Sequence, residues 1–267
     1  MRAVLNGEET ELSACTLEQL QRALGKADDI TIVNGYCTSG AYAIQPGDEI
    51  FIIPRGSMPK PGELEAMMAA RHTPGVHRKV KKGRVGIAGL GGLGSHIAVM
   101  LARTGVGHLL LVDYDVVEPS NLNRQNYRVS HLGMKKTEAL KMQIGEINPY
   151  IEVETIDVKV DAENAEGIFR GCQVVCEAFD APETKAEFTA AILEKLPGTY
   201  LVGASGMAGY LSANTIHTEK RMERYFICGD QTSGAAPGQG LMAPRVQVCA
   251  GHQANMALRL LLELYEE

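Results

Sequence analysis

The spacing of apolar residues changes near residue 80, and the two spacings predict different architectures. In residues 1–57, short apolar runs alternate with turns such as Asn6-Gly7 and Asn34-Gly35. Asn-Gly pairs favour the positive backbone angles of tight turns. One helix is expected from Thr16, a capping residue, to Leu24. Strands are expected at residues 3–5, 9–12, 30–33, 41–44 and 50–53.

Residues 80–267 alternate apolar strand patterns with helical patterns. Strands are expected at residues 85–88, 109–112, 151–156, 174–178 and 200–204. Helices are expected at residues 94–104, 135–147, 182–196 and 245–263. This alternation predicts an α/β domain with a Rossmann-like, mostly parallel sheet and helices on both faces.

The first 57 residues predict a smaller domain of another kind. Strands on both sides of one helix in so short a segment are typical of a β-grasp, ubiquitin-like α+β fold. Pro59, Pro61 and Gly62 then mark a linker, with a helix expected at 63–71. The predicted organisation is therefore a β-grasp domain at 1–57, a linker with a helix at 58–79, and the α/β domain at 80–267.

The net charge of −6 disfavours a nucleic acid as the main partner, because binding to a phosphate backbone needs a positive surface. The basic run from Arg78 to Arg84 is interpreted as a solvated approach to a buried strand. No apolar run approaches the ~18 residues that span a bilayer, and the N-terminus turns polar too early for a secretory signal. A cytoplasmic protein without a membrane partner is expected.

Six cysteines are scattered along the chain without a CxxC pair. This spacing argues against a disulfide framework and against a four-cysteine zinc site, so no structural zinc is expected. Cys172, Cys176 and Cys249 lie in apolar contexts and are predicted to be inert core residues.

A glycine-rich loop between the first strand and helix of the α/β domain is the first sign of chemistry. Gly89, Gly91, Gly92 and Gly94 leave room for backbone N–H groups and a helix N-terminus to meet phosphate. Asp113 ends the next strand, where an acidic side chain usually receives a ribose hydroxyl. Up to this point, an NAD-binding oxidoreductase fits equally well.

Arg124 and Lys136 favour chemistry at phosphorus over redox chemistry. A redox dinucleotide keeps its pyrophosphate intact, whereas displacement at phosphorus requires stabilisation of charge on the equatorial oxygens and the leaving group. A planar Arg and a mobile Lys suit that task. Each alone is more often a solvated surface charge, so the surrounding sequence decides.

That surrounding sequence resembles a known family. The string from Asp113 to Gln125, followed by Lys136, Asp180 and the run from Gly240 to Arg245, is similar to the adenylation core of the ubiquitin-activating superfamily. The bacterial ThiF and MoeB families belong to this superfamily. Residues 1–57 resemble the ThiS sulfur carriers, through Leu5-Asn6-Gly7, Thr16-Leu17, Val33-Asn34-Gly35 and Gly47-Asp48-Glu49-Ile50. This ThiS-like N-terminus and the string from Ala70 to His77 point more narrowly to the ThiF family 2 branch, which carries such an extension.

The resemblance implies a role for each matching residue. The four loop glycines would bound the ATP phosphate site, Asp113 would hold the ribose, and Asp115 would line the same pocket. Asn121 and Arg124 would contact the phosphates, and Arg124 and Lys136 would stabilise the transition state at the α-phosphorus. Asp180 would bind Mg²⁺, which prefers oxygen ligands. Its alternative role is to cap the helix that begins at Pro182.

Two departures from relatives refine the expectation. Many relatives have a cysteine just before the Gly-x-Met-Ala-Pro run, where this chain has Ala235 and Ala236, so adenylation without a covalent carrier–enzyme intermediate is expected. The ThiS-like unit continues into Pro54 instead of ending in a free Gly-Gly carboxylate. It is therefore interpreted as a docking or inherited module rather than a substrate. The glycine-rich segment 229–240 is interpreted either as a loop that threads the carrier tail or as a surface loop.

The function that the resemblance implies is ATP- and Mg²⁺-dependent adenylation of the C-terminal carboxylate of a ThiS-type sulfur carrier protein, in thiamine (thiazole) biosynthesis, by a homodimer. One alternative keeps the chemistry but acts on another carrier, or on a tRNA-linked carboxylate. A second is an NAD-binding oxidoreductase. A third is a non-catalytic nucleotide-binding module whose carrier site is occupied by its own fused domain.

Overall fold

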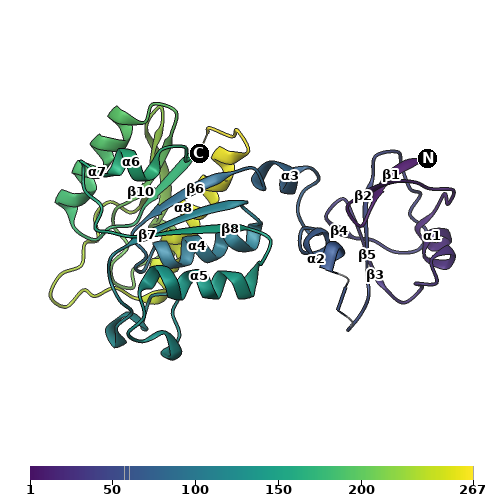
Figure 1. Cartoon of the computed structure of the whole chain (residues 1–267), viewed down its shortest axis with the longest axis horizontal. Helices are drawn as coiled ribbons and strands as arrows, with labels where there is room; N and C mark the ends of the chain where they lie inside the picture. Colours follow the sequence, from purple (N-terminus) through teal and green to yellow (C-terminus); the bar gives the residue numbers. More distant parts are fainter. Residues whose placement is uncertain (57, 60, 267) are drawn as a thin grey trace. The chain divides into compact units, whose positions relative to one another are not determined.

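The computed structural model describes residues 1–56, 58–59 and 61–266. The described chain forms two compact units, Met1–Arg78 and Lys79–Glu267 (Figure 1), and each is described by itself. Three residues lie outside the described ones: Ser57, the expected last residue of the β-grasp domain, Lys60 in the expected linker, and Glu267 at the expected end of the second domain.

The first unit has the predicted β-grasp fold. Its sheet has the strand order β2-β1-β5-β3-β4, and helix α1 crosses one face. The helix begins as expected, because the Thr16 hydroxyl accepts the Gln19 N–H while the Gln19 side chain accepts the Thr16 N–H. The elements are β1 (Arg2–Leu5), β2 (Glu8–Glu11), α1 (Leu17–Ala23), β3 (Ile30–Val33), β4 (Tyr36–Cys37) and β5 (Glu49–Ile53).

The strand predicted at 41–44 is wrong. This segment forms a loop with a single bridge, between Ala43 and Thr16. Its backbone bonds to the residues that precede and begin α1 rather than to a strand of the sheet, because the Leu17 N–H donates to the Tyr42 carbonyl at 3.1 Å and the Ile44 N–H donates to the Cys15 carbonyl at 3.0 Å. The short edge strand β4 was not predicted.

Both faces of the β-grasp sheet are covered within the first unit. Alternation along β5 sends Ile50 and Ile52 towards α1, whereas Phe51 joins Ile32 and Ala70 in a second cluster. Ala70 follows helix α2 (Pro61–Met68), and Ala66 of α2 packs on the same cluster. Residues after the β-grasp domain therefore complete its core.

The second unit contains a seven-stranded sheet of order β11-β12-β10-β9-β6-β7-β8, which confirms the predicted fold class. The predicted strands are present, with ends shifted by at most one residue. The β11–β12 pair is antiparallel and the other pairs in this sheet are parallel. The strands are β6 (Arg84–Ala88), β7 (His108–Asp113), β8 (Glu152–Asp157), β9 (Val174–Glu177), β10 (Tyr200–Ala204), β11 (His217–Met222) and β12 (Tyr225–Gly229).

Helices cover both faces of this sheet, as predicted. In Figure 1, α4, α5 and α8 lie on one side of the strands, and α6 and α7 lie on the other. On the second side, Phe169 of α6 packs edge-on against Phe188 of α7, with ring centroids 5.5 Å apart. The helices are α3 (Val76–Val80), α4 (Gly94–Thr104), α5 (Lys136–Ile147), α6 (Ala165–Phe169), α7 (Pro182–Lys195) and α8 (Ala243–Leu261).

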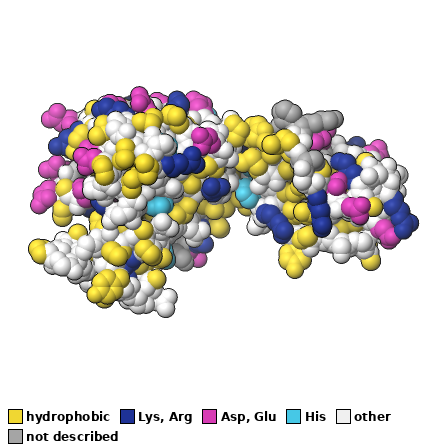
Figure 2. Space-filling model, turned by 90° about the horizontal axis from the view of Figure 1, so that it is seen from below, with side chains coloured by type: hydrophobic (Ala, Val, Ile, Leu, Met, Phe, Trp, Pro, Cys, Tyr) yellow, Lys and Arg dark blue, Asp and Glu magenta, His cyan; other side chains and the backbone are white. Residues whose placement is uncertain are grey.

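The surface carries both signs of charge. On the face shown in Figure 2, Lys and Arg side chains are interspersed with Asp and Glu. Among the residues that the structure describes, no helix has the length and apolar character that crossing a bilayer requires.

Candidate active site

Three loops meet where β9, β6 and β7 end. The Gly89 N–H donates to the Val112 carbonyl at 2.9 Å, and the Ala178 N–H donates to the Ala88 carbonyl at 2.9 Å. These parallel strands are neighbours, so their carboxyl ends place the glycine loop between Asp113 on one side and Asp180 on the other. Ligands of open α/β sheets bind at this edge.

The glycine loop turns sharply into α4. A Cβ atom at Gly94 would lie 1.8 Å from the Gly89 carbonyl oxygen, so only glycine fits there. The Leu90 N–H donates to Asp113 Oδ2 at 2.6 Å, and Asp113 Oδ1 accepts the Asp115 N–H at 2.8 Å. Buried Asp113 therefore shapes the loop, and its oxygens retain further lone pairs for a ligand hydroxyl.

Lys136 faces the two aspartates. Its side chain is 7% exposed, and its Nζ lies 2.7 Å from Asp115 Oδ2 and 3.9 Å from Asp113 Oδ2. Lys136 is the first residue of α5, and its N–H donates to the Asp115 carbonyl at 3.0 Å. The structure thus brings Lys136, Asp113 and Asp115 into one cluster beside the glycine loop.

Arg124 lies over the same loop. Its Cγ is 3.7 Å from the position that a Cβ atom on Gly92 would take. Its guanidinium donates to the Ser120 carbonyl at 3.1 Å and to Asn123 Oδ1 at 2.9 Å. Buried Asn121 accepts the Glu118 N–H at 3.0 Å, so its amide organises the turn that carries Arg124.

Asp180 is exposed in the loop between β9 and α7. Among the described residues, α7 has Ala181 as its N-cap and no side-chain cap hydrogen bond, so the alternative of Asp180 as a helix cap is wrong. The described residues contain no group of three or more His, Cys, Asp or Glu placed to hold a metal ion. A metal ion held by Asp180 would need further oxygens from a ligand, which is common for Mg²⁺.

The thiols of the second unit are buried, which confirms the predicted core position of Cys172, Cys176 and Cys249. Burial raises the pKa of Cys172 to about 11. Burial also raises the pKa of Cys228 to about 12, although a hydrogen bond with Thr218 acts to lower it. A nucleophilic cysteine must be a thiolate, so Cys228 is unsuited to covalent catalysis.

A buried ion pair under the site was missed from the sequence. Glu177, at the end of β9, has a side chain 2% exposed. Its Oε1 lies 3.0 Å from Lys185 Nζ, which also donates to the Ala204 carbonyl at 2.9 Å. Glu177 Oε1 also accepts the Phe179 N–H at 2.7 Å. The available signal was an acidic residue that ends an otherwise apolar strand, five residues before the start of the helix that carries Lys185.

A second missed pair anchors the glycine-rich segment 229–240. Arg245, near the start of α8, is 3% exposed and forms an ion pair with Asp230. Its guanidinium also donates to the Leu211 carbonyl at 2.9 Å and to Thr215 Oγ1 at 3.1 Å. The same side chain therefore fixes two separate segments of chain, one after β10 and one after β12.

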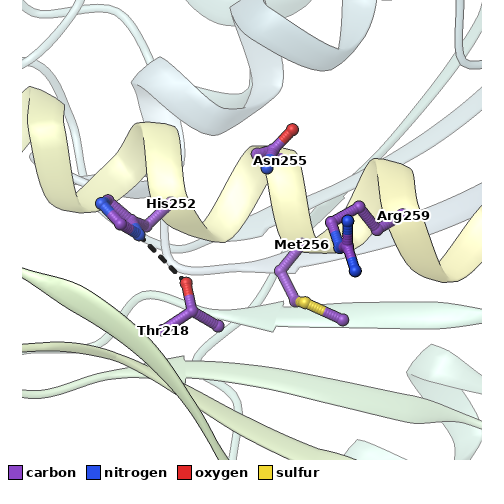
Figure 3. Close-up of a pocket in the computed structure, with 5 residues that line it drawn as sticks. All are labelled: Thr218, His252, Asn255, Met256 and Arg259. Atoms are coloured by element: carbon purple, nitrogen blue, oxygen red, sulfur yellow. Dashed lines mark hydrogen bonds between the residues drawn. The ribbon is translucent and has the colours of Figure 1, made fainter. Parts of the chain in front are cut away.

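A separate groove lies between β11 and α8 (Figure 3). Thr218 Oγ1 and His252 Nδ1 are 3.0 Å apart at one end, and burial, with His217 nearby, lowers the pKa of His252. Asn255, Met256 and Arg259 complete its lining. Strand β11 is at the sheet edge, and three strands lie between it and β6, so this groove is not the site at the glycine loop.

Comparison with known protein families identifies the family of each unit of the chain. Residues 65–267 match the ThiF family, and residues 1–56 match the ThiS-like ubiquitin family. The chain belongs to the ThiF family and carries an N-terminal ThiS-like ubiquitin domain, which confirms the resemblance drawn from the sequence.

Similar proteins include enzymes with related names. The adenylyltransferase and sulfurtransferase UBA4 of Yarrowia lipolytica is 29% identical over 69% of this chain and 47% of its own length. The Saccharomyces cerevisiae protein of that name is 32% identical over 70% of this chain and 43% of its own length. The molybdopterin-synthase adenylyltransferase of Haemophilus influenzae is 31% identical over 70% of this chain and 77% of its own length. The chain thus spans less than half the length of the UBA4 relatives.

Solved structures share the fold. The Escherichia coli tRNA N6-threonylcarbamoyladenosine dehydratase TcdA, in complex with ATP, superposes with a TM-score of 0.68 at 21% identity, over 78% of this chain and 98% of that one. Escherichia coli MccB with ATP superposes with a TM-score of 0.57 at 22% identity, over 81% and 68%.

Proposed function

We propose that this chain is an adenylyltransferase that uses ATP to activate the C-terminal carboxylate of a small sulfur carrier protein. The observation that carries the proposal is that Arg124 and Lys136 lie around one glycine loop, with Asp113 at the end of β7 and Asp180 in the loop that follows β9. The names of the UBA4 and molybdopterin-synthase relatives, and ATP complexes of proteins with this fold, support it.

In the proposed reaction, a carboxylate oxygen of the carrier attacks the α-phosphorus of ATP. The bond from that phosphorus to the bridging oxygen breaks, pyrophosphate leaves with the electron pair, and an acyl-adenylate forms. Arg124 and Lys136 stabilise the charge that develops on the phosphoryl oxygens, and the loop N–H groups hold the phosphates. Asn121 supports the turn that positions Arg124, and Asp113 receives the ribose.

Lys136 supplies its charge from a nearly buried position. In the free protein it faces Asp115 and Asp113, so the positive charge of its ammonium group is balanced by these carboxylates before ATP binds. A triphosphate would compete with Asp115 for the lysine. Because the lysine is nearly buried, its attraction to a phosphate would be stronger than in bulk water. Asp180 is the residue that would hold Mg²⁺, whose other ligands would be phosphate oxygens and water. Bound there, Mg²⁺ would neutralise the leaving pyrophosphate.

The finer assignment is a ThiS-type carrier and thiamine (thiazole) synthesis, in a cytoplasmic homodimer without structural zinc. The fused ThiS-like domain supports this choice of carrier. A carrier of the molybdopterin type is the second candidate, favoured by the Haemophilus influenzae relative. A tRNA-linked carboxylate is disfavoured by the net charge of −6.

Exchange of labelled pyrophosphate into ATP tests the function. We expect exchange with a ThiS-type carrier and not without a carrier, and a molybdopterin-type carrier tests the second candidate. Arg124→Ala is expected to lower exchange about 10²- to 10³-fold, comparable to the loss of one oxyanion donor. Arg128→Ala is the matched control, because this arginine makes an exposed pair with Glu146. Equal exchange by both variants would show that Arg124 is misassigned, and no exchange with any carrier would contradict the function.

A further inference from the structure

We propose that Tyr127 and Ser95 are positioning residues that aim two backbone N–H groups of the glycine loop at the nucleotide phosphates. The inference rests on the proposed nucleotide site and deepens it. Nothing in the sequence pattern singles out either residue, because both act through hydrogen bonds to the backbone of the loop.

Tyr127 fixes the first peptide of the loop. Its hydroxyl donates to the Leu90 carbonyl at 2.8 Å, and both residues are buried. Burial raises the pKa of Tyr127, with the charges of Asp113 and Asp115 adding to the effect, so the hydroxyl remains a donor at physiological pH. Asp113 holds the Leu90 N–H on the other side. Leu90 is thus clamped at both its N–H and its carbonyl.

Ser95 fixes the second peptide. Its hydroxyl donates to the Gly91 carbonyl at 2.7 Å, and the Ser95 N–H donates to the same carbonyl at 3.1 Å. The Ser95 hydroxyl oxygen also accepts the Asn126 N–H at 2.9 Å. The Gly91 carbonyl is therefore turned towards the first turn of α4.

These two constraints determine where the next N–H groups point. A trans peptide is planar, with its N–H opposite its carbonyl. Because the Leu90 and Gly91 carbonyls are held by Tyr127 and Ser95, the N–H groups of Gly91 and Gly92 point away from those side chains. Both glycines are partly exposed, and neither N–H has an acceptor among the described residues. Two adjacent free N–H groups at a helix start suit an anion.

The same bonds join the loop to the segment that carries Arg124. His96 Nε2 lies 3.0 Å from the Arg124 carbonyl, and since a carbonyl can only accept, this nitrogen is the donor. Together with the Ser95–Asn126 and Tyr127–Leu90 bonds, it makes three links between residues 90–96 and 124–127. The phosphate-facing N–H groups and the Arg124 stem are therefore held in one frame.

The test compares ATP with adenosine, which lacks phosphates, as ligands of the full chain in titration calorimetry. Tyr127→Phe removes only the hydroxyl, and Ser95→Ala provides a second variant with a similarly small change. Each is expected to weaken ATP binding about 5- to 10-fold, the effect of one lost hydrogen bond, and to change adenosine binding less than about twofold. Tyr200→Phe, at the amino end of β10, is the control and should leave both affinities unchanged.

The outcomes separate the positioning role from a structural one. A parallel loss of ATP and adenosine affinity, or unchanged ATP affinity in both variants, would overturn the positioning role while leaving the proposed function intact. Failure of the unsubstituted chain to bind ATP would overturn the proposed function as well.

Discussion

Arg245 connects two segments that follow different strands, and replacing it by methionine removes the charge while keeping most of the stem. Asp230 would remain, with a side chain only 7% exposed and without its counter-ion. Breaking one partner of a buried ion pair costs about 3–5 kcal/mol, because the other charge is left uncompensated. Two carbonyls, at Leu211 and Ser212, would also lose a donor.

That loss converts into a measurable shift. For a unit of 150–250 residues, 1 kcal/mol corresponds to about 2–4 °C in melting temperature. Arg245→Met is therefore expected to lower the melting temperature of the second unit by about 6–20 °C, measured by circular dichroism. Arg170→Met is the control, since Arg170 makes a surface pair with Glu166 at 71% side-chain exposure. Such a pair contributes less than about 1 kcal/mol.

A double variant tests the physical cause. In Arg245→Met/Asp230→Asn no charge is left uncompensated, so the double variant is expected to melt above Arg245→Met alone. Equal melting temperatures for Arg245→Met and Arg170→Met would refute the anchoring role. A double variant less stable than the sum of the two single changes would refute the electrostatic explanation.

Three further expectations follow from buried groups. Cys15 and Cys37 are exposed and the other four thiols are buried, so native alkylation at pH 8 followed by mass spectrometry should label two sites; labelling of four or more would contradict the burial. Gly35→Ala should lower the free energy of unfolding in urea by about 1–3 kcal/mol more than Gly40→Ala. Both glycines have positive φ, but only at Gly35 would a Cβ atom lie 2.5 Å from a carbonyl oxygen. Equal losses would show that the contact relaxes. Burial would raise the pKa of Asp230, but hydrogen bonds from Ser233 and Thr232 and the charge of Arg245 lower it. The ionised Asp230 therefore stabilises the folded state fully above about pH 4, and this stabilisation is lost on acidification. A difference in unfolding free energy between the wild type and Asp230→Asn that grows below that pH would contradict this sign.

The fold was predictable where apolar spacing was regular. Four of the five strands predicted in the second unit, β6, β7, β9 and β10, are buried parallel strands, which read as continuous apolar runs. The fifth, β8, lies at the sheet edge and alternates exposed with partly buried residues over most of its length. Strand β11 was missed because its sequence, His-Thr-Glu-Lys-Arg-Met, lies largely exposed at the sheet edge. Its partner β12 is apolar, but only two residues separate the two strands. The two strands could therefore have been predicted only together, as a β-hairpin. The short helices α3 and α6, of five residues each, carry too little periodicity to predict.

In the candidate site, the residues of the sequence motif were predictable but the contacts that support them were not. Glycines, Asp113, Arg124 and Lys136 occur in a recognisable order, and the structure brings them to one edge of the sheet. The supporting contacts of Tyr127, and the Glu177–Lys185 and Asp230–Arg245 pairs, depend on which segments meet in three dimensions. A single tyrosine or a lone charge in the sequence does not show its partner.

Helix α2 has a practical consequence for anyone who isolates the ThiS-like domain. A fragment cut at residue 57 would leave Ile32 and Phe51, now 3% and 7% exposed, facing solvent. A small domain with a bare apolar sheet face is prone to self-association. The natural cut for a soluble fragment lies after Arg78, where the compact unit ends.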